Sequence, residues 1–267
     1  MIIALKKILK SILYGVAKSI SFVVENKAVY RYLYRYLSFT RRKAIAQYDV
    51  IQKKVLTKYD VPYHVFFETR TKCNGRCTFC SASLGNDKRE DRIIPTELHN
   101  KIISELSELN FRGLIGYYNN NEPLLDKRLP VLIKYAKNKL TGAYIRVLTN
   151  GLLLSERIVE DLYNAGLDWL CINCYEEKAK TKIKKIYNKI REKHSDFRVE
   201  MNLRKQDEIL LNRAGKVPNK APLNYSLSSF CWNPFAQMII TPDGKVPLCC
   251  QDFYVEEEMG NVNPTVA

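Results

Sequence analysis

The sequence predicts an α/β fold in which strands and helices alternate. From residue 64 onward, short runs rich in β-branched and aromatic residues alternate with amphipathic segments long enough to form helices. This order is typical of a parallel sheet covered by helices. Turn residues, among them Asn150 and Gly151, separate the two kinds of segment. With 267 residues the chain is long enough for one large domain or two smaller ones.

The N-terminal segment, taken as residues 1–60, predicts a helical extension. Residues 2–24 place apolar side chains every three or four positions, and residues 28–54 mix aromatic and basic side chains. The net charge of the chain is +15, and residues 1–50 hold ten Lys or Arg against two acidic residues. The favoured interpretation is that these predicted helices pack on the barrel or on a partner. A peripheral membrane contact is the second, and nucleic-acid binding is disfavoured because no RNA-binding fold accompanies the pattern.

No membrane-spanning helix is expected, because lysines interrupt every apolar window near the N-terminus. A secretory signal is not expected either, since the apolar run 12–17 is short and no cleavage pattern follows it. The expected location is therefore the cytoplasm, at a membrane surface if the basic helices bind there.

The predicted elements then follow in order along the chain. Strands are expected at 64–71, 114–118, 143–148, 169–175 and 197–203, and helices at 95–110, 129–139, 155–165 and 176–193. Residues 204–230 predict an irregular connection. After it, 237–241 and 245–248 flank a Pro-Asp-Gly turn and predict a β-hairpin.

Three cysteines follow the first predicted strand as Cys73-Asn-Gly-Arg-Cys77-Thr-Phe-Cys80. A structural zinc site takes four protein ligands, and a simple electron-transfer 4Fe–4S cluster takes four thiolates. Three thiolates leave one iron open to another ligand. Zinc and the absence of a metal are the alternatives to a cluster; His99 as a fourth ligand is disfavoured because it lies within a predicted helix.

The C-x3-C-x2-C spacing resembles that of the radical SAM superfamily, and the resemblance runs from about residue 64 to the end. It implies a partial (β/α) barrel over residues 61–225 and a 4Fe–4S cluster on Cys73, Cys77 and Cys80. The open iron of that cluster would bind S-adenosylmethionine (SAM), whose reductive cleavage yields a 5′-deoxyadenosyl radical. A reductant such as flavodoxin or ferredoxin is implied as well.

Further residues resemble SAM-binding motifs of that superfamily. Asn121-Glu122-Pro123 resembles its GGEP motif, with Asn120 and Asn121 in place of glycines, and implies that Glu122 holds the SAM ammonium. Thr149-Asn150-Gly151 resembles its TNG turn, and Asn173 stands where a strand serine often faces SAM. Cys171 and Cys174 lie three apart on a strand, hence on opposite faces, and are interpreted as core residues.

The C-terminal segment, taken as residues 226–267, resembles a SPASM or twitch module. Cys231, Gly244 and Cys249 match its C-x(9–15)-G-x4-C opening, and Cys250 adjoins. The resemblance implies an auxiliary iron–sulfur cluster on Cys231, Cys249 and Cys250, although no cysteine follows Cys250. A zinc site or a purely structural hairpin are the alternatives.

The sequence therefore predicts an enzyme that cleaves SAM reductively and abstracts hydrogen from a peptide or a sugar- or glycan-related substrate. Two other classes of function compete with this prediction. One is a zinc-stabilised binding protein, and the other is a catalytically inactive adaptor at a membrane surface or on RNA.

Overall fold

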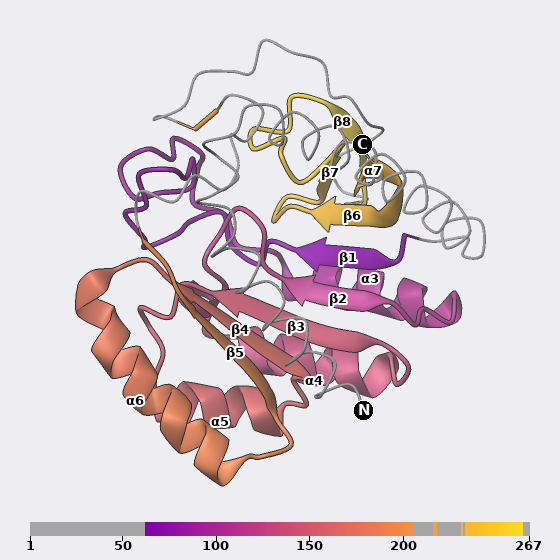
Figure 1. Ribbon diagram of the computed structural model, residues 1–267. Coiled ribbons are helices and arrows are strands. Elements are labelled where there is room, and N and C mark those ends of the chain that lie inside the picture. The colour runs from indigo at the N-terminus through magenta and orange to yellow at the C-terminus, as the bar shows by residue number, and fades with distance from the viewer. Residues whose placement is uncertain (1–61, 206–215, 218–230, 232, 264–267) are drawn as a thin grey trace, which may run out of the picture. The chain divides into compact units, whose positions relative to one another are not determined.

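Six parallel strands form the central sheet, in the order β5-β4-β3-β2-β1-β6 (Figure 1). The strands are β1 (His64–Phe67), β2 (Leu114–Tyr117), β3 (Tyr144–Thr149), β4 (Trp169–Cys174), β5 (Arg198–Leu203) and β6 (Gln237–Ile240). The first five strands follow the sequence prediction, and together with the helices between them they confirm an α/β fold with a partial barrel.

The computed structural model describes residues 62–205, 216–217, 231 and 233–263. All of these belong to one of the two units into which the chain divides, Leu56–Ala267. The predicted helical extension, its membrane contact and most of the irregular connection lie outside the described residues. None of the helices within the described ranges is long and apolar enough to cross a membrane.

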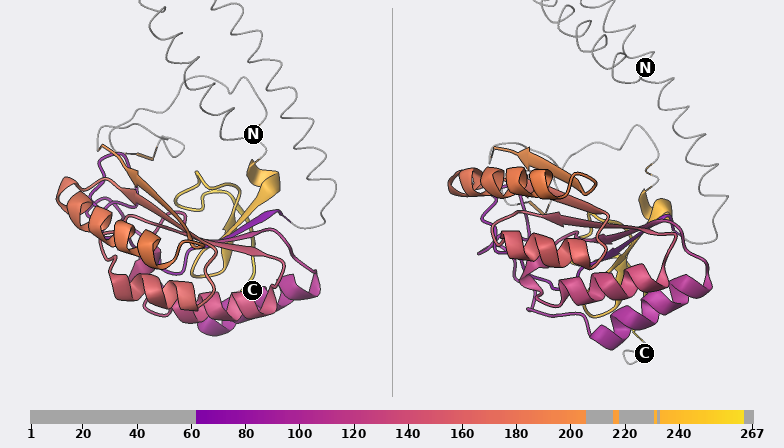
Figure 2. Two further views of the ribbon diagram at one scale, coloured as in Figure 1. Left: turned by 60° about the horizontal axis from the view of Figure 1, so that its bottom comes forward. Right: turned by 90° about the horizontal axis from the view of Figure 1, so that it is seen from below.

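Helices connect the consecutive strands and lie along one face of the sheet (Figure 2). They are α3 (Thr96–Glu108), α4 (Leu129–Lys139), α5 (Glu156–Asn164) and α6 (Glu177–Lys193). Ser155 caps α5 by accepting a hydrogen bond from the Ile158 amide, as its position before the apolar pattern predicts. A short 3-10 turn, η1 (Pro123–Leu125), follows β2.

The two faces of the sheet differ in chemistry. On β3, Ile145 and Val147 are fully buried and belong to the core packed under the helices, whereas Arg146 and Leu148 are only partly buried. Strand residues alternate between faces, so one face of β3 builds the apolar core and the other carries the partly buried Arg146 and Leu148. This second face is the inner face of the partial barrel.

The C-terminal segment corrects one detail of the sequence prediction. The turn at Pro242-Asp243-Gly244 forms, with Gly244 at φ +87°. However, β6 joins the main sheet in parallel with β1. The antiparallel pair is instead β7 (Lys245–Pro247) with β8 (Glu258–Asn261), and a short helix α7 (Asn233–Ala236) precedes β6. The predicted hairpin partner was wrong because a turn signal fixes where the chain reverses, not which edge accepts the next strand.

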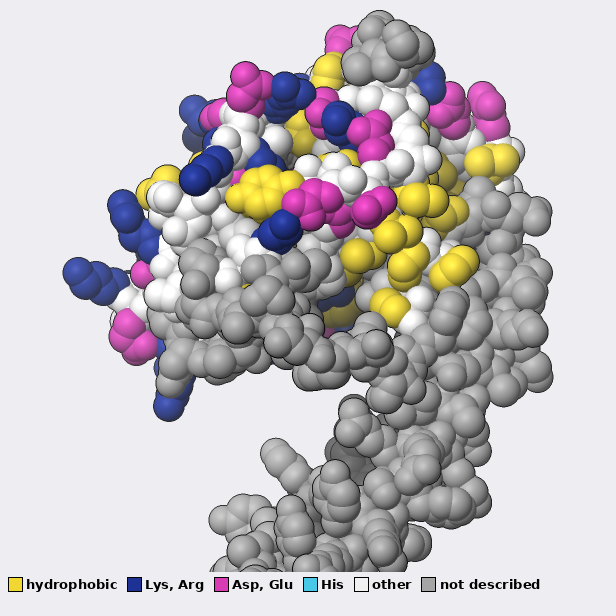
Figure 3. Space-filling view, turned by 90° about the horizontal axis from the view of Figure 1, so that it is seen from above, with side chains coloured by type: hydrophobic (Ala, Val, Ile, Leu, Met, Phe, Trp, Pro, Cys, Tyr) yellow, Lys and Arg dark blue, Asp and Glu magenta, His cyan; other side chains and the backbone are white. Residues whose placement is uncertain are grey.

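Figure 3 looks onto the side that carries the C-terminal strands. Basic and acidic side chains lie interspersed on that face, and ion pairs such as Arg92–Asp243 (3.0 Å) and Lys216–Glu256 (2.6 Å) belong to this part of the chain. Both charge signs are mixed there, so the basic excess of residues 1–50 is not continued as a basic patch on this described face.

Candidate active site

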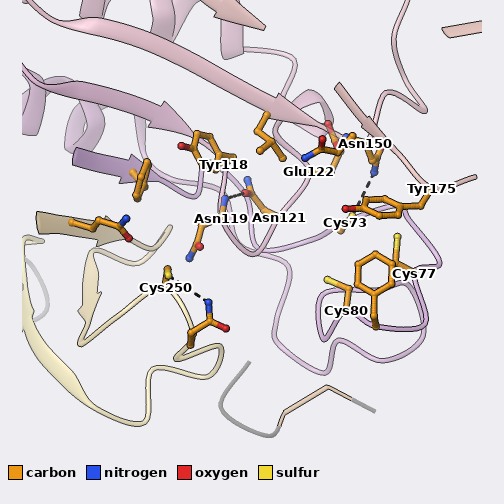
Figure 4. A pocket seen from close by; sticks show the side chains of 16 residues that line it. Cys73, Cys77, Cys80, Tyr118, Asn119, Asn121, Glu122, Asn150, Tyr175 and Cys250 are labelled. Atoms are coloured by element: carbon orange, nitrogen blue, oxygen red, sulfur yellow. Dashed lines mark hydrogen bonds between the residues drawn. The ribbon is translucent and has the colours of Figure 1, made fainter. Parts of the chain in front are cut away.

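The cysteine motif lies in the loop that follows β1, at the end of the sheet where active sites of β/α barrels form. Cys73, Cys77 and Cys80 all line one cavity of about 420 Å³, the cluster cavity (Figure 4). Its other walls come from the segments after β2, β3 and β4, and from Cys250 and Gln251 of the C-terminal module. The structure thus brings the three predicted ligands together at one site.

Local hydrogen bonds hold the cysteine loop. The Leu84 amide donates to the Gly75 carbonyl at 2.7 Å, and the Cys80 amide donates to the Cys77 carbonyl at 3.2 Å. A Cβ atom on Gly75 would lie 3.5 Å from the Cys73 sulfur and 3.7 Å from the Cys77 sulfur. Glycine at this position therefore leaves the space between the two sulfurs open.

The cysteine thiols are held in partly buried surroundings. Burial raises the pKa of Cys73 to about 11 and that of Cys77 to about 12. The Gly75 amide (3.3 Å) and the Asn150 side-chain amide (3.6 Å) donate to the Cys73 sulfur and partly offset this rise. The Cys73 and Cys77 thiols are protonated at neutral pH without a metal, so metal binding to these two residues must displace protons.

The three cysteines of the loop fit the ligand set of a cluster. A structural zinc site takes four protein ligands, whereas in an iron–sulfur cluster each thiolate binds a different iron. Among the described residues, no three His, Cys, Asp or Glu side chains are grouped so that they could hold one metal ion. Cys73, Cys77 and Cys80 do line one cavity, as the ligands of a shared cluster would.

Glu122 is buried at the cluster cavity and accepts three hydrogen bonds from the chain. The donors are the Thr149 hydroxyl (2.6 Å), the Asn150 amide (2.8 Å) and the Leu124 amide (3.1 Å). Burial raises the pKa of Glu122 to about 7, and the three donors limit that rise. The carboxylate therefore joins the segment after β2 to the end of β3. A contact with the SAM ammonium stays a prediction.

Asn121 lines the same cavity with an unused donor. Its side-chain oxygen accepts from the Asn119 amide at 3.2 Å, while its Nδ2 atom is buried without a hydrogen-bond partner among the described residues. An unsatisfied buried donor at a cavity is costly unless a ligand pairs with it. Asn121 thus fits the predicted role of a cofactor contact, although glycine is usual in the motif that it resembles.

Of the other residues predicted to contact SAM, two line the cluster cavity and two do not. Asn150 and Asn173 line the cluster cavity. Thr149 is fully buried against Glu122. Gly151 has φ +77°, and a Cβ there would lie 2.8 Å from Ile183 and 2.9 Å from Ile172, so packing alone already requires glycine. A direct role of Gly151 towards SAM stays a prediction.

Two residues that the sequence analysis missed organise this end of the sheet. Glu68, buried just after β1, accepts from the Asn120 amide at 3.0 Å and pairs with Arg89 at 3.3 Å. Arg89 also donates to the Asn120 carbonyl at 2.7 Å and lies 4.1 Å from the Phe253 ring centroid. Arg89 thereby connects the cysteine loop, the segment after β2 and the C-terminal module. An acid and an arginine 21 residues apart carry no sequence signal that would reveal this pairing.

The remaining cysteines and His99 lie as follows. Cys171 and Cys174 are buried, and only Cys174 belongs to the core under the helices. Their burial on opposite faces of β4 argues against a shared metal ion. His99 is buried in α3, and its Nε2 atom lies 2.9 Å from the Tyr117 hydroxyl. It does not line the cluster cavity.

The C-terminal cysteines do not converge in the described structure. Cys231 is exposed, and Cys249 and Cys250 are half-buried. Cys250 lines the cluster cavity, across from the cysteine loop in Figure 4, whereas Cys249 lines a separate cavity beside Lys216 and Asp252. The assignment of Cys231, Cys249 and Cys250 as ligands of an auxiliary cluster stays a prediction.

Comparison with known families decides the class. Residues 68–203 match the model of the radical SAM superfamily. The chain belongs to the radical SAM superfamily. Members of this superfamily bind a 4Fe–4S cluster and SAM, and the chain is a SAM-dependent enzyme of that class. Residues 231–266 match the SPASM iron–sulfur cluster-binding domain, so the predicted resemblance is confirmed at both ends.

Individual relatives show the range of chemistry in the superfamily. The S-adenosyl-L-methionine-dependent 2-deoxy-scyllo-inosamine dehydrogenase of Niallia circulans is 27% identical over 198 residues, which are 73% of this chain and 76% of the relative. The PqqA peptide cyclase of Granulibacter bethesdensis is 29% identical over 113 residues, 42% of this chain and 29% of the relative.

Solved structures agree with the radical SAM fold. The crystal structure of BtrN in complex with AdoMet and 2-DOIA has a TM-score of 0.65 and 27% sequence identity to this chain. The alignment of the two structures covers 76% of this chain and 79% of the BtrN chain.

Proposed function

We propose that this radical SAM protein cleaves SAM reductively at a 4Fe–4S cluster held by Cys73, Cys77 and Cys80, and abstracts hydrogen from a substrate in the cluster cavity. The observation that supports it is the meeting of three cysteines with Glu122 and Asn150 at one cavity. When bound, the cluster and SAM supply the electron and the carbon radical. The chain supplies the ligands, the orientation of SAM and the exclusion of water.

Residues on several walls of the cluster cavity would orient SAM or exclude water. Asn121 offers a buried donor to the polar end of SAM. The rings of Phe79 and Tyr175 lie 4.7 Å apart and bring the cysteine loop against the segment after β4. Such an apolar wall limits the access of water to a reactive intermediate. Cys250 and Gln251 close the side towards the C-terminal module.

A sugar-related substrate is favoured over a peptide. The relative named as a 2-deoxy-scyllo-inosamine dehydrogenase aligns with 73% of this chain, while the peptide cyclase aligns with 42%. The alignment with the 2-deoxy-scyllo-inosamine dehydrogenase therefore spans more of this chain than the alignment with the peptide cyclase. A peptide is the second candidate.

The test is SAM cleavage by anaerobically reconstituted, full-length protein. With dithionite and SAM, the wild-type protein is expected to produce 5′-deoxyadenosine and to absorb broadly in the visible range. The triple variant Cys73→Ala, Cys77→Ala, Cys80→Ala should produce none, because no open-iron cluster can form. Cys171→Ala, which removes a thiol outside the cavity, should retain the product. Product at the wild-type level in the triple variant would disprove the assignment.

The competing classes separate in the same preparation. A zinc-stabilised binding protein would contain zinc and neither iron nor sulfide. An inactive adaptor would hold a cluster but release no 5′-deoxyadenosine. The reductant, a flavodoxin or ferredoxin, is proposed from the superfamily, and titration with each reduced protein in place of dithionite tests it.

A further inference from the structure

A second cavity lies at the opposite end of the strands from the cysteine loop. This floor cavity, of about 440 Å³, is lined at the start of the strands by His64, Arg146, Trp169 and Gln237, and by Arg112 before β2. It shares Phe66, Tyr118 and Gln237 with the cluster cavity. The two cavities therefore adjoin along the inner face of the sheet.

Three polar atoms in the floor cavity lack partners. The Nδ1 atom of His64, the Nε atom of Arg146 and the Nε1 atom of Trp169 are buried and form no hydrogen bond with the described part of the chain. The arginine and tryptophan atoms can only donate, and the histidine atom donates in one tautomer. Buried donors without partners are rare in folded proteins and call for an explanation such as a ligand.

Positive charge in this cavity has no counter-charge. The guanidinium of Arg146 lies 3.8 Å from the Trp169 ring centroid and 5.2 Å from that of Tyr118, so aromatic rings rather than a carboxylate hold it. No Asp or Glu lines the cavity, and neither Arg146 nor Arg112 forms an ion pair within the described part of the chain. Burial and the charge of Arg146 lower the pKa of His64, which leaves it a neutral donor at pH 7.

We propose that the floor cavity binds an oxyanion of the substrate, a phosphate or a carboxylate. A guanidinium without an ion pair, beside further buried N–H donors at the same cavity, is the chemistry that recognises such groups. The inference rests on the proposed function for the reaction itself and adds the substrate class: a sugar-related molecule with an anionic group.

The distance between the two cavities sets the size of this substrate. Arg146 and Asn150 lie four residues apart on and after β3, which corresponds to about 13 Å of strand. A substrate anchored at Arg146 must span most of that length to present a C–H bond in the cluster cavity. The aromatic side chain of Tyr144 lines the anchored end and offers a flat surface to a ring, whereas the Trp169 ring is covered by Arg146 and Arg198.

Anion binding is measured on reconstituted, full-length protein without SAM. Inorganic phosphate and acetate are titrated separately by isothermal calorimetry, with sodium chloride at equal ionic strength as the reference. The wild-type protein should bind at least one of the two oxyanions saturably. Arg146→Gln and Trp169→Phe should each weaken that binding at least tenfold. The second variant keeps an aromatic ring against Arg146 and removes the indole N–H together with the second ring of the indole.

Arg157→Gln is the matched control, because Arg157 lies on α5 with its side chain 92% exposed. It should bind the oxyanion as the wild type does. Tighter binding of phosphate would indicate a phosphate group on the substrate, and tighter binding of acetate a carboxylate. Either result supports the proposal. No saturable binding by the wild type, or equal affinity in Arg146→Gln and Arg157→Gln, would overturn it. Should Arg146→Gln fail to fold, Trp169→Phe decides.

The same preparation separates this inference from the proposed function. Saturable anion binding without 5′-deoxyadenosine would contradict the radical reaction and leave the floor site standing. Production of 5′-deoxyadenosine without anion binding would contradict the floor site alone.

Discussion

The Glu122 carboxylate accepts a hydrogen bond of 2.6 Å from the Thr149 hydroxyl, across two neighbouring strand ends. With the Asn150 amide at 2.8 Å, this bond joins the segment after β2 to the turn after β3. One acidic side chain thereby fixes the relative position of two motifs that resemble SAM-binding sequences. Its loss should affect both the fold of this end and the binding of SAM.

The first prediction is that Glu122→Gln weakens SAM binding by about 1.5–3 kcal/mol, the range for hydrogen bonds to charged groups. The new amide group would also face donors, so the free energy of unfolding should fall. Thr149→Val removes one donor but keeps the carboxylate, and should weaken SAM binding less. Calorimetric SAM titration and iron content check this; cluster content should not change. An unaltered SAM affinity would leave Glu122 a purely structural residue.

Arg89 should be far more important than its neighbour Arg92. The Arg89 side chain is 14% exposed and pairs with the buried Glu68, whereas that of Arg92 is 50% exposed. Arg89→Gln leaves a buried carboxylate unpaired and should cost about 3–5 kcal/mol of stability. Arg92→Gln, the control, should cost about 0–1 kcal/mol. Urea unfolding of both variants measures the difference, and similar costs would contradict the role given to Arg89.

Gly151 and Gly85 make a matched pair for backbone strain and packing. Both have positive φ, +77° and +95°, but a Cβ on Gly85 would have no neighbour within 4 Å. Gly85→Ala should therefore cost about 1 kcal/mol from the left-handed conformation alone. Gly151→Ala adds overpacking against Ile172 and Ile183, typically about 1–3 kcal/mol more. Thermal unfolding compares them; equal shifts would mean that the contacts around Gly151 yield easily.

His99 should make stability sensitive to acid. Burial lowers its pKa to about 4, from an ordinary value of 6.5. Below pH 6.5 the unfolded chain gains a proton on this residue that the folded chain does not. The contribution of His99 to the free energy of unfolding is therefore fully present above pH 6.5. It is lost as the pH drops towards 4, by about 3 kcal/mol in all. His99→Gln lacks this titration, so its unfolding free energy should fall less over the same interval. Parallel pH curves for the two proteins would refute the prediction.

Iron content tests the C-terminal cysteines. If Cys231, Cys249 and Cys250 hold a second cluster, the wild type should contain about eight irons, by counting two four-iron clusters. The triple alanine variant of these three residues should then contain about four. Equal iron in the two proteins would assign the C-terminal cysteines a structural role only.

All six strands of the sheet and the cysteine loop could be predicted from the sequence, because both depend on local patterns; only the pairing of the strand at 237–240 differs. The strand at His64–Phe67 is apolar and β-rich, and the loop after it carries a fixed cysteine spacing. Both signals are contained within a few residues of one another.

Contacts between distant segments could not be read in this way. β6 pairs with β1, and Arg89 pairs with Glu68, through geometry that exists only once the sheet has formed. The anion-recognising character of Arg146 was equally hidden, since an isolated arginine on a strand has no pattern until its neighbours are known.

The pairing of β1 with β6 has a consequence for synthesis of the protein. During translation, residues 64–67 leave the ribosome long before residues 237–240, which complete that side of the sheet. Until then Val65, Phe66 and Phe67 form an uncovered strand edge, the kind of surface that recruits other chains into aggregates. Folding of the sheet therefore depends on the C-terminal segment. A fragment that ends before Gln237 should express poorly, even though it contains every cysteine of the loop.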